Sequence, residues 1–252
     1  MIRFRIRNVF RNGWLLLEWL ILLFLLFRTL WPHFILYAIP DGYDMLSVIS
    51  IPLSLSAVSP FASVFCSFPV SSIFPTEYNE GFTKSALMRS CRNRYIRGLF
   101  VETLFAGGLA IAVPYAILFF YAAIKAGPAS AETLSQYYQG TVWHAMALRD
   151  GGYSVLLWKT ILAALFGWVW SLMGLLMSTL FLNRYIGAIA PFIVCQTLWA
   201  LLTNSKFNPV YLLNANGVYW SSIFEIVAIQ MILCAFLIFL TARLLRWRCK
   251  NV

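Results

Sequence analysis

Six long apolar runs, separated by short polar connections, dominate the sequence. None of them alternates apolar and polar residues with a period of two, and each is far longer than a strand of a membrane β-barrel. The hydrocarbon core of a bilayer is about 30 Å thick, so a helix needs about 20 apolar residues to cross it. Because the backbone must satisfy its own hydrogen bonds there, the pattern predicts an all-α polytopic membrane protein. The predicted spans are Trp14–Leu36, Met45–Phe68, Leu99–Ile124, Val155–Phe181, Tyr185–Leu202 and Ser222–Leu245.

The composition agrees with this fold class. Apolar residues make up 61% of the 252 residues and charged residues only 11%. A water-soluble domain could not hide that much apolar surface. We therefore expect one six-helix transmembrane domain at 14–252, preceded by a short helix at 1–13. Within the domain, 74–98 and 125–154 are the longest polar connections of the cytosolic and outer sides.

Positive charge gathers in alternate connections. Of the 19 Lys and Arg residues, 14 lie before span one, between spans two and three, between spans four and five, or in and after the last turn of span six. Cytosolic connections carry such an excess, so both termini are expected in the cytosol. The net charge of +10 is then a topological signal. No segment is long enough to fold a basic nucleic-acid-binding domain, so no nucleic-acid partner is expected. The expected location is a cell membrane, specifically the bacterial cytoplasmic membrane.

The first 13 residues have the pattern of an amphipathic helix. Apolar residues share one helical face at Ile2, Ile6, Val9 and Phe10. Arginines four apart form a stripe beside that face, at Arg3, Arg7 and Arg11. This arrangement is typical of an interfacial helix that lies along the lipid headgroups. It serves either as a topology anchor or as a lever or docking helix.

The connection between spans two and three carries the most informative residues. Pro75 is expected to stop or kink the preceding helix. Thr76 is a suitable N-cap for a short helix with Glu77 and Glu80 in its first turn, where the helix dipole favours negative charge. Gly81 would end or hinge that helix. A short acidic helix before a basic stretch suits a soluble partner, although a solvated loop would have the same composition.

Here the chain resembles the permease subunits of type-2 ABC exporters. The local likeness runs from Phe74 to Pro114 and consists of Glu77-Tyr78, Glu80-Gly81-Phe82, Arg89, Tyr95 and Gly107-Gly108. The overall layout of six spans, cytosolic ends and an N-terminal amphipathic helix is also similar. The resemblance implies that Thr76–Lys84 is a coupling helix that docks on a separate ATPase. The docking residues it implies are Thr76, Glu77, Tyr78, Glu80, Gly81 and Lys84. The connection 203–221 departs from the family, since it shows no obvious pair of re-entrant helices.

The resemblance implies a permease subunit that exports its substrate by alternating access. Its expected partners are an ABC ATPase, a second permease copy in a homodimer or heterodimer, and the lipid bilayer. The chain lacks GxxxxGK[ST], so ATP and Mg²⁺ are expected on the partner ATPase, and the chain itself is not expected to be an enzyme. The 17% of aromatic residues and the scarcity of charge in the spans favour an apolar or amphipathic cargo, such as a peptide, lipid or drug-like molecule.

Two other functions compete with export. An intramembrane enzyme would need paired catalytic groups at one depth, and the sequence offers no clear pair. An energy-coupling scaffold of a vitamin-uptake transporter also docks ATPases, but usually has long cytosolic helices. No metal site is expected, because the five cysteines and two histidines lack metal-ligand spacing.

Span four carries a seam of small residues. They repeat at intervals of four and three, at Thr160, Ala164, Gly167, Ser171, Gly174 and Ser178. Such seams let helices approach closely in lipid. We expect packing within the chain first, with Gly107, Gly108 and Ala112 as the facing surface, and dimerisation second.

Span two is interrupted by prolines and rich in serine. Pro52, Pro60 and Pro69 leave backbone carbonyls that serines or water can satisfy. The serines therefore either line a substrate pathway or cap the proline defects. The candidate pathway residues are Arg28, Ser54, Ser59 and Ser63.

Charged residues inside spans are costly and need partners. Near the cytosolic boundary, Glu18 and Glu102 are expected to pair with basic residues, among them Arg11, Arg94 and Arg97. Lys159 and Glu225 begin their spans at similar depth and are candidates for a pair across helices.

Overall fold

The computed structural model describes residues 2–11, 13–30, 44–56, 58–89, 91–131, 134, 138–203, 205–215 and 220–250. Of these, Ile2, Arg3, Phe4, Asn8, Arg11 and Leu55 have no described side chain. The described chain is helical, and its one β-bridge is the isolated pair Asp44–Gly127. The helices are α1 (Ile2–Arg11), α2 (Gly13–Leu30), α3 (Met45–Leu55), α4 (Val58–Ser71), α5 (Ile73–Asn79), α6 (Phe82–Arg89), α7 (Arg92–Lys125), α9 (Trp143–Asp150), α10 (Tyr153–Phe181), α11 (Arg184–Leu201), α12 (Pro209–Asn214) and α13 (Ile223–Arg248).

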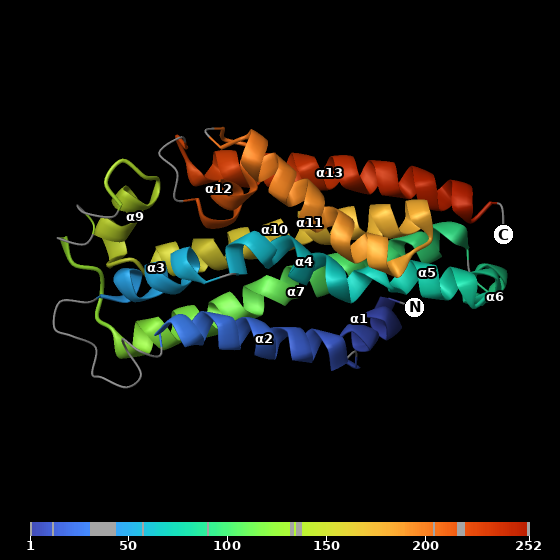
Figure 1. Ribbon diagram of the computed structural model, residues 1–252, viewed down its shortest axis with the longest axis horizontal. Coiled ribbons are helices and arrows are strands. Elements are labelled where there is room, and N and C mark those ends of the chain that lie inside the picture. Colours follow the sequence, from blue (N-terminus) through green and yellow to red (C-terminus); the bar gives the residue numbers. More distant parts are fainter. Residues whose placement is uncertain are drawn as a thin grey trace.

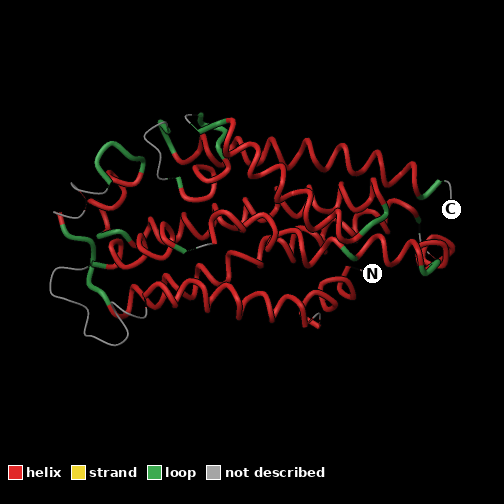
Figure 2. The backbone as a smooth tube through the Cα atoms, viewed as in Figure 1, coloured by secondary structure: helices red, strands yellow, loops and turns green. Residues whose placement is uncertain are grey.

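Six helical segments are long and apolar enough to cross a bilayer, so this prediction is confirmed. They are α2, α4 continued through α5, α7, α10, α11 and α13. These helices form an elongated bundle (Figure 1), in which α10 packs against α7, α4, α11 and α13. The tube in Figure 2 shows loops mainly at the two ends of the bundle. The fold is that of a multi-pass α-helical membrane protein.

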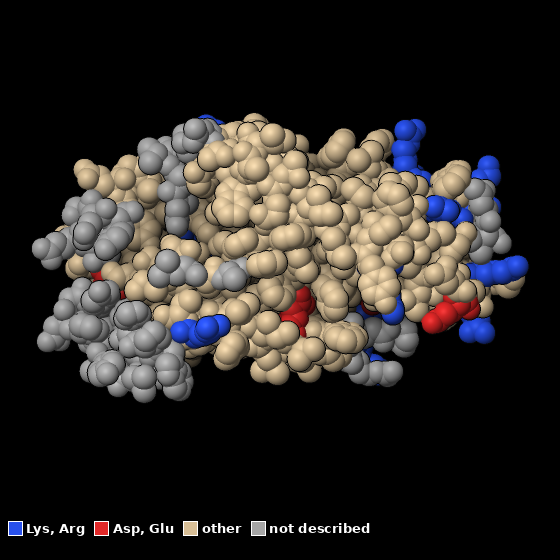
Figure 3. Space-filling view, viewed as in Figure 1, with Lys and Arg blue, Asp and Glu red and all other residues tan. Residues whose placement is uncertain are grey.

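The two ends of the bundle differ in charge (Figure 3). We call one of them the basic end; it consists of α1, α5, α6, the starts of α7 and α11, and the end of α13. Its described basic residues are Arg5, Arg7, Lys84, Arg89, Arg92, Arg94, Arg97, Arg184, Arg243, Arg246, Arg248 and Lys250. The opposite, or far, end carries α9, α12 and the first turns of α10 and α13. Both chain ends lie toward the basic end (Figure 1).

The second predicted span is not one helix. Ser56 has an extended backbone (φ −72°, ψ 150°) and ends α3, and α4 begins at Val58. Pro60 has no N–H to donate to the carbonyl four residues earlier, which favours a break at this place. The hydroxyl of Ser59 donates to the carbonyl of Leu53 across the break, over 3.1 Å. The span predicted at Met45–Phe68 is therefore two helices, with an interruption of the kind that its prolines indicated.

Small residues of α10 pack within the chain. A Cβ on Gly167 would overlap the carbonyl oxygen of Gly107, and one on Gly107 would overlap the side chain of Ser171. On the next turns a Cβ on Gly174 would lie 2.7 Å from the Cβ of Ser67. Glycine is thus needed where α10 touches α7 and α4, because close backbone approach supplies van der Waals contact in lipid.

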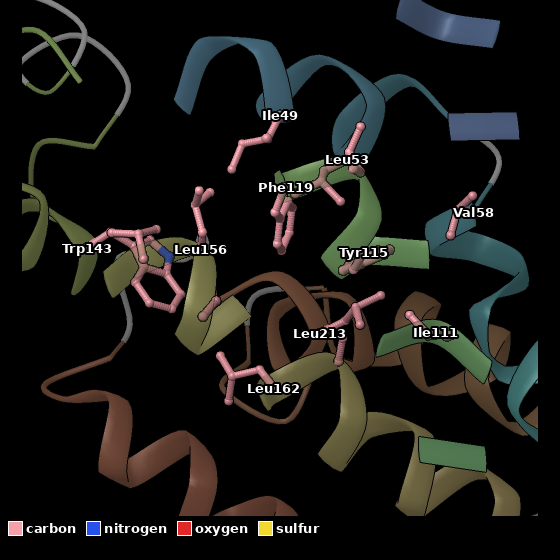
Figure 4. Close-up of a cluster of buried hydrophobic side chains, with 14 of the residues drawn as sticks. Ile49, Leu53, Val58, Ile111, Tyr115, Phe119, Trp143, Leu156, Leu162 and Leu213 are labelled. Atoms are coloured by element: carbon pink, nitrogen blue, oxygen red, sulfur yellow. The ribbon is translucent and has the colours of Figure 1, made fainter. Parts of the chain in front are cut away.

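A buried core fills the half of the bundle nearer the far end (Figure 4). Ile49 and Leu53 of α3 lie there with Phe119 of α7, Leu156 of α10 and Leu213 of α12, all buried. Elsewhere the outer faces of the spans expose large apolar side chains, and a belt across the middle in Figure 3 is largely without Lys, Arg, Asp or Glu, apart from one acidic patch. Such a belt suits contact with lipid rather than water.

Candidate functional site

The end of the second spanning segment and the connection that follows it fold into two short helices at the basic end. Helix α5 begins at Ile73, with Ser72 in the N-cap position, and so Thr76 lies inside the helix. Pro75 is the third helical residue, where a missing N–H costs nothing because the first N–H groups of a helix have no intrahelical acceptor. The sequence-based N-cap at Thr76 is therefore wrong.

Gly81 makes the corner between the two helices. Its φ of +72° is in the left-handed region that favours glycine, and it separates α5 from α6. The predicted coupling helix Thr76–Lys84 is consequently two helices with a corner, which we call the α5–α6 hairpin. Cys91 then occupies the N-cap position of α7.

An arginine of α1 is held between two glutamates at the root of this hairpin. Arg5 Nη1 donates to Glu102 Oε2 over 2.7 Å and lies 2.8 Å from Glu77 Oε1. Its Nη2 donates to Glu77 Oε2 over 2.9 Å. The side chains of Arg5, Glu77 and Glu102 are 3%, 19% and 7% exposed. This set, the Arg5 clamp, ties α1 to α5 and α7.

Tyr95 of α7 completes the clamp. Its hydroxyl donates to Glu77 Oε2 over 2.6 Å, and its ring lies 5.3 Å from the guanidinium carbon of Arg5. Thr83 Oγ1 of α6 lies 3.3 Å from the same hydroxyl. The clamp therefore includes both helices of the hairpin.

The charges of the clamp stabilise one another. Burial alone would lower the pKa of Arg5, but the hydrogen bonds and negative charges of Glu77 and Glu102 outweigh it and raise this pKa. The guanidinium stays protonated and faces two carboxylates, which would repel each other without it. A buried, hydrogen-bonded charge pair is strongly destabilised when one partner is removed.

The predicted docking residues divide into two groups. Thr76, Glu80, Gly81 and Lys84 are exposed. Glu77 belongs to the clamp, and Tyr78 is half-buried with its ring 5.7 Å from that of Phe74. A soluble partner would therefore meet the first group, together with two apolar side chains that the sequence reasoning passed over. These are Phe82, 48% exposed, and Met88, 76% exposed.

A hollow of about 370 Å³ adjoins the exposed side of α5. It lies between α5 and the turn from α10 to α11, and Thr76, Glu80 and Arg184 are among its lining residues. Opposite charges thus face the same hollow at the basic end. This surface can receive a polar segment of another protein.

The N-terminal helix packs against the bundle. Helix α1 contacts α7 and α2, Val9 is buried, and the ring of Phe10 meets that of Phe105 edge-on at 5.7 Å. Arg7 is exposed, whereas the side chains of Arg3 and Arg11 lie outside the described residues. The sequence did not single out Arg5. This arginine lies on the apolar face formed by Ile2, Ile6 and Val9, one turn from Ile2 and one turn from Val9, where a charge needs a buried partner.

The prediction that Glu102 pairs with Arg94 or Arg97 is wrong. Glu102 pairs with Arg5 instead, and Arg94 and Arg97 are exposed. Glu18 is buried in α2, and neither of its carboxylate oxygens has a hydrogen-bond partner among the described residues.

The expected pair of Lys159 and Glu225 is also wrong. Lys159 Nζ donates to the carbonyl of Asn214 over 2.8 Å and lies 4.8 Å from the ring of Trp143. Glu225 pairs instead with Lys206 over 2.7 Å. The reason is that α12, within 203–221, folds inward against α10 and brings its terminal carbonyl to the lysine.

The four candidate pathway residues do not share one environment. Arg28 is exposed on the last turn of α2, and Ser54 is exposed on α3. Ser59 is half-buried and Ser63 fully buried. Because Ser59 bonds across the break between α3 and α4, it follows the alternative in which serines cap proline defects.

Comparison with known proteins adds no relative. No protein-family model, curated protein or solved structure matches the chain.

Proposed function

We propose that this protein is the permease subunit of an ATP-driven exporter of the type-2 ABC class, with both termini in the cytosol. The observation that carries the proposal is the Arg5 clamp, since it joins a partly exposed hairpin between the second and third spans to α1 and α7. Such a surface suits a separate ATPase, which would supply the energy. A second permease copy would complete the pathway for an apolar or amphipathic substrate.

The clamp gives a route from the ATPase to the membrane. When the ATPase subunits close, the exposed side of the hairpin moves with them. The ion pairs of Arg5 with Glu77 and Glu102 transmit that motion to α1 and to the first turns of α7. Helices α7 and α10 meet backbone to backbone at Gly107 and Gly167, because neither residue has a side chain. The two helices therefore move together. Rigid-body rocking of packed helices is the usual basis of alternating access.

The docking surface is tested by a matched pair of substitutions. Met88→Asp, combined with Glu80→Lys, changes exposed residues of the hairpin and leaves the clamp intact. We expect the purified variant to lose the ATPase with which the unaltered chain copurifies under this proposal, together with the ATP turnover of the complex. Leu148→Asp is the control, because it also replaces an exposed apolar residue by aspartate, but on α9 at the far end. Retention of the ATPase by the hairpin variant would refute the docking assignment.

The orientation is tested with a native cysteine. Cys91, beside the hairpin, is exposed, whereas Cys66, Cys195, Cys234 and Cys249 are buried. A membrane-impermeant maleimide should therefore label the chain in inverted vesicles and leave it unlabelled in intact cells, with Cys91→Ser as the blank. Labelling in intact cells would place the basic end outside and exclude ATPase docking there.

A further inference from the structure

A cavity of about 180 Å³ opens between α10, α11 and α13, beneath α12. Its walls are aliphatic and aromatic, and include Phe166 and Met173 of α10, Leu198 of α11 and Leu237 of α13. For comparison, a dry apolar cavity of about 150 Å³ binds benzene, whereas whole drug-sized ligands need about 300 Å³ or more. The cavity is therefore large enough for part of a molecule.

One polar residue lines this apolar space. Gln230 lines the cavity and is 1% exposed, and its Nε2 donates to the carbonyl of Leu212 over 2.7 Å. Because a carbonyl only accepts, this bond fixes the orientation of the amide, and Oε1 is the free end. Oε1 has no hydrogen-bond partner among the described residues. Leaving a buried acceptor unsatisfied is costly, most of all inside a membrane.

Water does not suit this site. An ordered water makes about three hydrogen bonds, and a lining of aliphatic and aromatic side chains does not supply them. At the depth of Gln230 in the spanning helix α13, the protein is surrounded by the bilayer and not by water. Gln230 lies seven residues into α13, about 10 Å from its first residue, and Leu237 lies about another 10 Å along the helix. A ligand would thus place a donor near Gln230 and an apolar chain alongside Leu237.

We propose that this cavity binds a lipid from the bilayer, through one apolar chain and an O–H or N–H group that donates to Gln230 Oε1. The cavity accepts part of the chain, and the remainder leaves between α10 and α13 past Phe236, which is exposed. The proposal concerns binding alone and does not rest on the proposed transport function.

The test uses a pair of probes that differ only in the donor. One is a long-chain alcohol with a diazirine halfway along its chain, and the other is its methyl ether. Each is mixed into phosphatidylcholine nanodiscs that hold the full chain, and the labelled residues are located by mass spectrometry after irradiation. We expect the alcohol to label the cavity walls of α10 and α13 about threefold to tenfold more than the ether, as one hydrogen bond implies.

Two substitutions assign the difference to the site. Gln230→Leu should reduce labelling by the alcohol to the level of the ether. Gln196→Leu is the matched control, since this glutamine of α11 is bonded to the carbonyl of Pro60 and does not line the cavity, so the preference should persist. Leu233→Trp, which fills the cavity, should reduce labelling by both probes.

Some outcomes would overturn the proposal even if Gln230→Leu failed to fold. Equal labelling by alcohol and ether in the unaltered chain would exclude a role for Oε1. Labelling spread evenly over all lipid-facing helices would exclude a site. A disulfide between two copies of a Phe236→Cys variant would show that a second copy, rather than lipid, covers this groove.

Discussion

Arg5 and Glu102 are 97 positions apart in the sequence, yet the guanidinium of the first donates to the carboxylate of the second over 2.7 Å. The bond joins the short N-terminal helix to the third spanning helix. Glu77 shares the same guanidinium, so the hairpin depends on this arginine too. One basic side chain thus keeps three separate segments in register.

Loss of Arg5 should therefore lower the free energy of unfolding far more than loss of Arg7 on the same helix. Arg5→Leu leaves two carboxylates close together without a cation, and we expect it to lower the free energy of unfolding by about 3–5 kcal/mol. Arg7→Leu removes an exposed arginine from the same helix and should change that free energy by less than about 0.5 kcal/mol. Chemical denaturation in detergent micelles measures both. Equal effects would mean that the clamp contributes no more than a surface charge.

The phenol of Tyr95 should make a separable contribution. Tyr95→Phe keeps the buried ring and removes the donor to Glu77, and a hydrogen bond to a charged group is worth about 1.5–3 kcal/mol. Tyr78→Phe, on the hairpin itself, is the control and should cost less than about 0.5 kcal/mol. The comparison is made by the same denaturation. A Tyr95→Phe variant as stable as the control would show that Glu77 needs no donor besides Arg5.

The long apolar runs predicted the coarse architecture correctly. Runs such as that from Val155 to Phe181 had to become helices, because no other backbone conformation satisfies its hydrogen bonds in hydrocarbon. The small-residue pattern also pointed to a close helix contact, and the structure places Gly167 against Gly107. These features depend on local composition, which a single sequence displays.

Pairings between distant segments were not predictable in the same way. Arg5 could be noticed as a charge on an apolar helix face, but nothing local selects Glu77 and Glu102 from the nine acidic residues. Lys159 found a backbone carbonyl, a partner that every residue offers and no sequence pattern marks. The prolines of span two indicated an interruption but not its position, since prolines are also tolerated in unbroken membrane helices.

The contact between α7 and α10 should tolerate no added methyl group. Gly167→Ala forces a Cβ into the carbonyl of Gly107, so the helices must separate, and overpacking of this kind costs about 1–3 kcal/mol. Gly13→Ala adds the same group at the start of α2, where nothing lies within 4 Å, and should be nearly neutral. Thermal unfolding of both variants in one detergent makes the comparison. Similar midpoints would indicate that the two backbones are not in direct contact.

Replacing each of two buried glutamates by leucine should change the free energy of unfolding in opposite directions. Glu102→Leu removes a hydrogen-bonded partner of Arg5 and is expected to lower the free energy of unfolding by about 1.5–3 kcal/mol. Glu18→Leu removes a buried carboxyl group for which the described residues provide no hydrogen bond, and should raise that free energy by about 1–3 kcal/mol. Denaturation of the two variants side by side gives both signs. A different result would be that Glu18→Leu destabilises the protein as much as Glu102→Leu does. The carboxyl group of Glu18 would then have to be hydrogen-bonded by a group beyond the described residues, which would compensate the cost of burying it in the membrane.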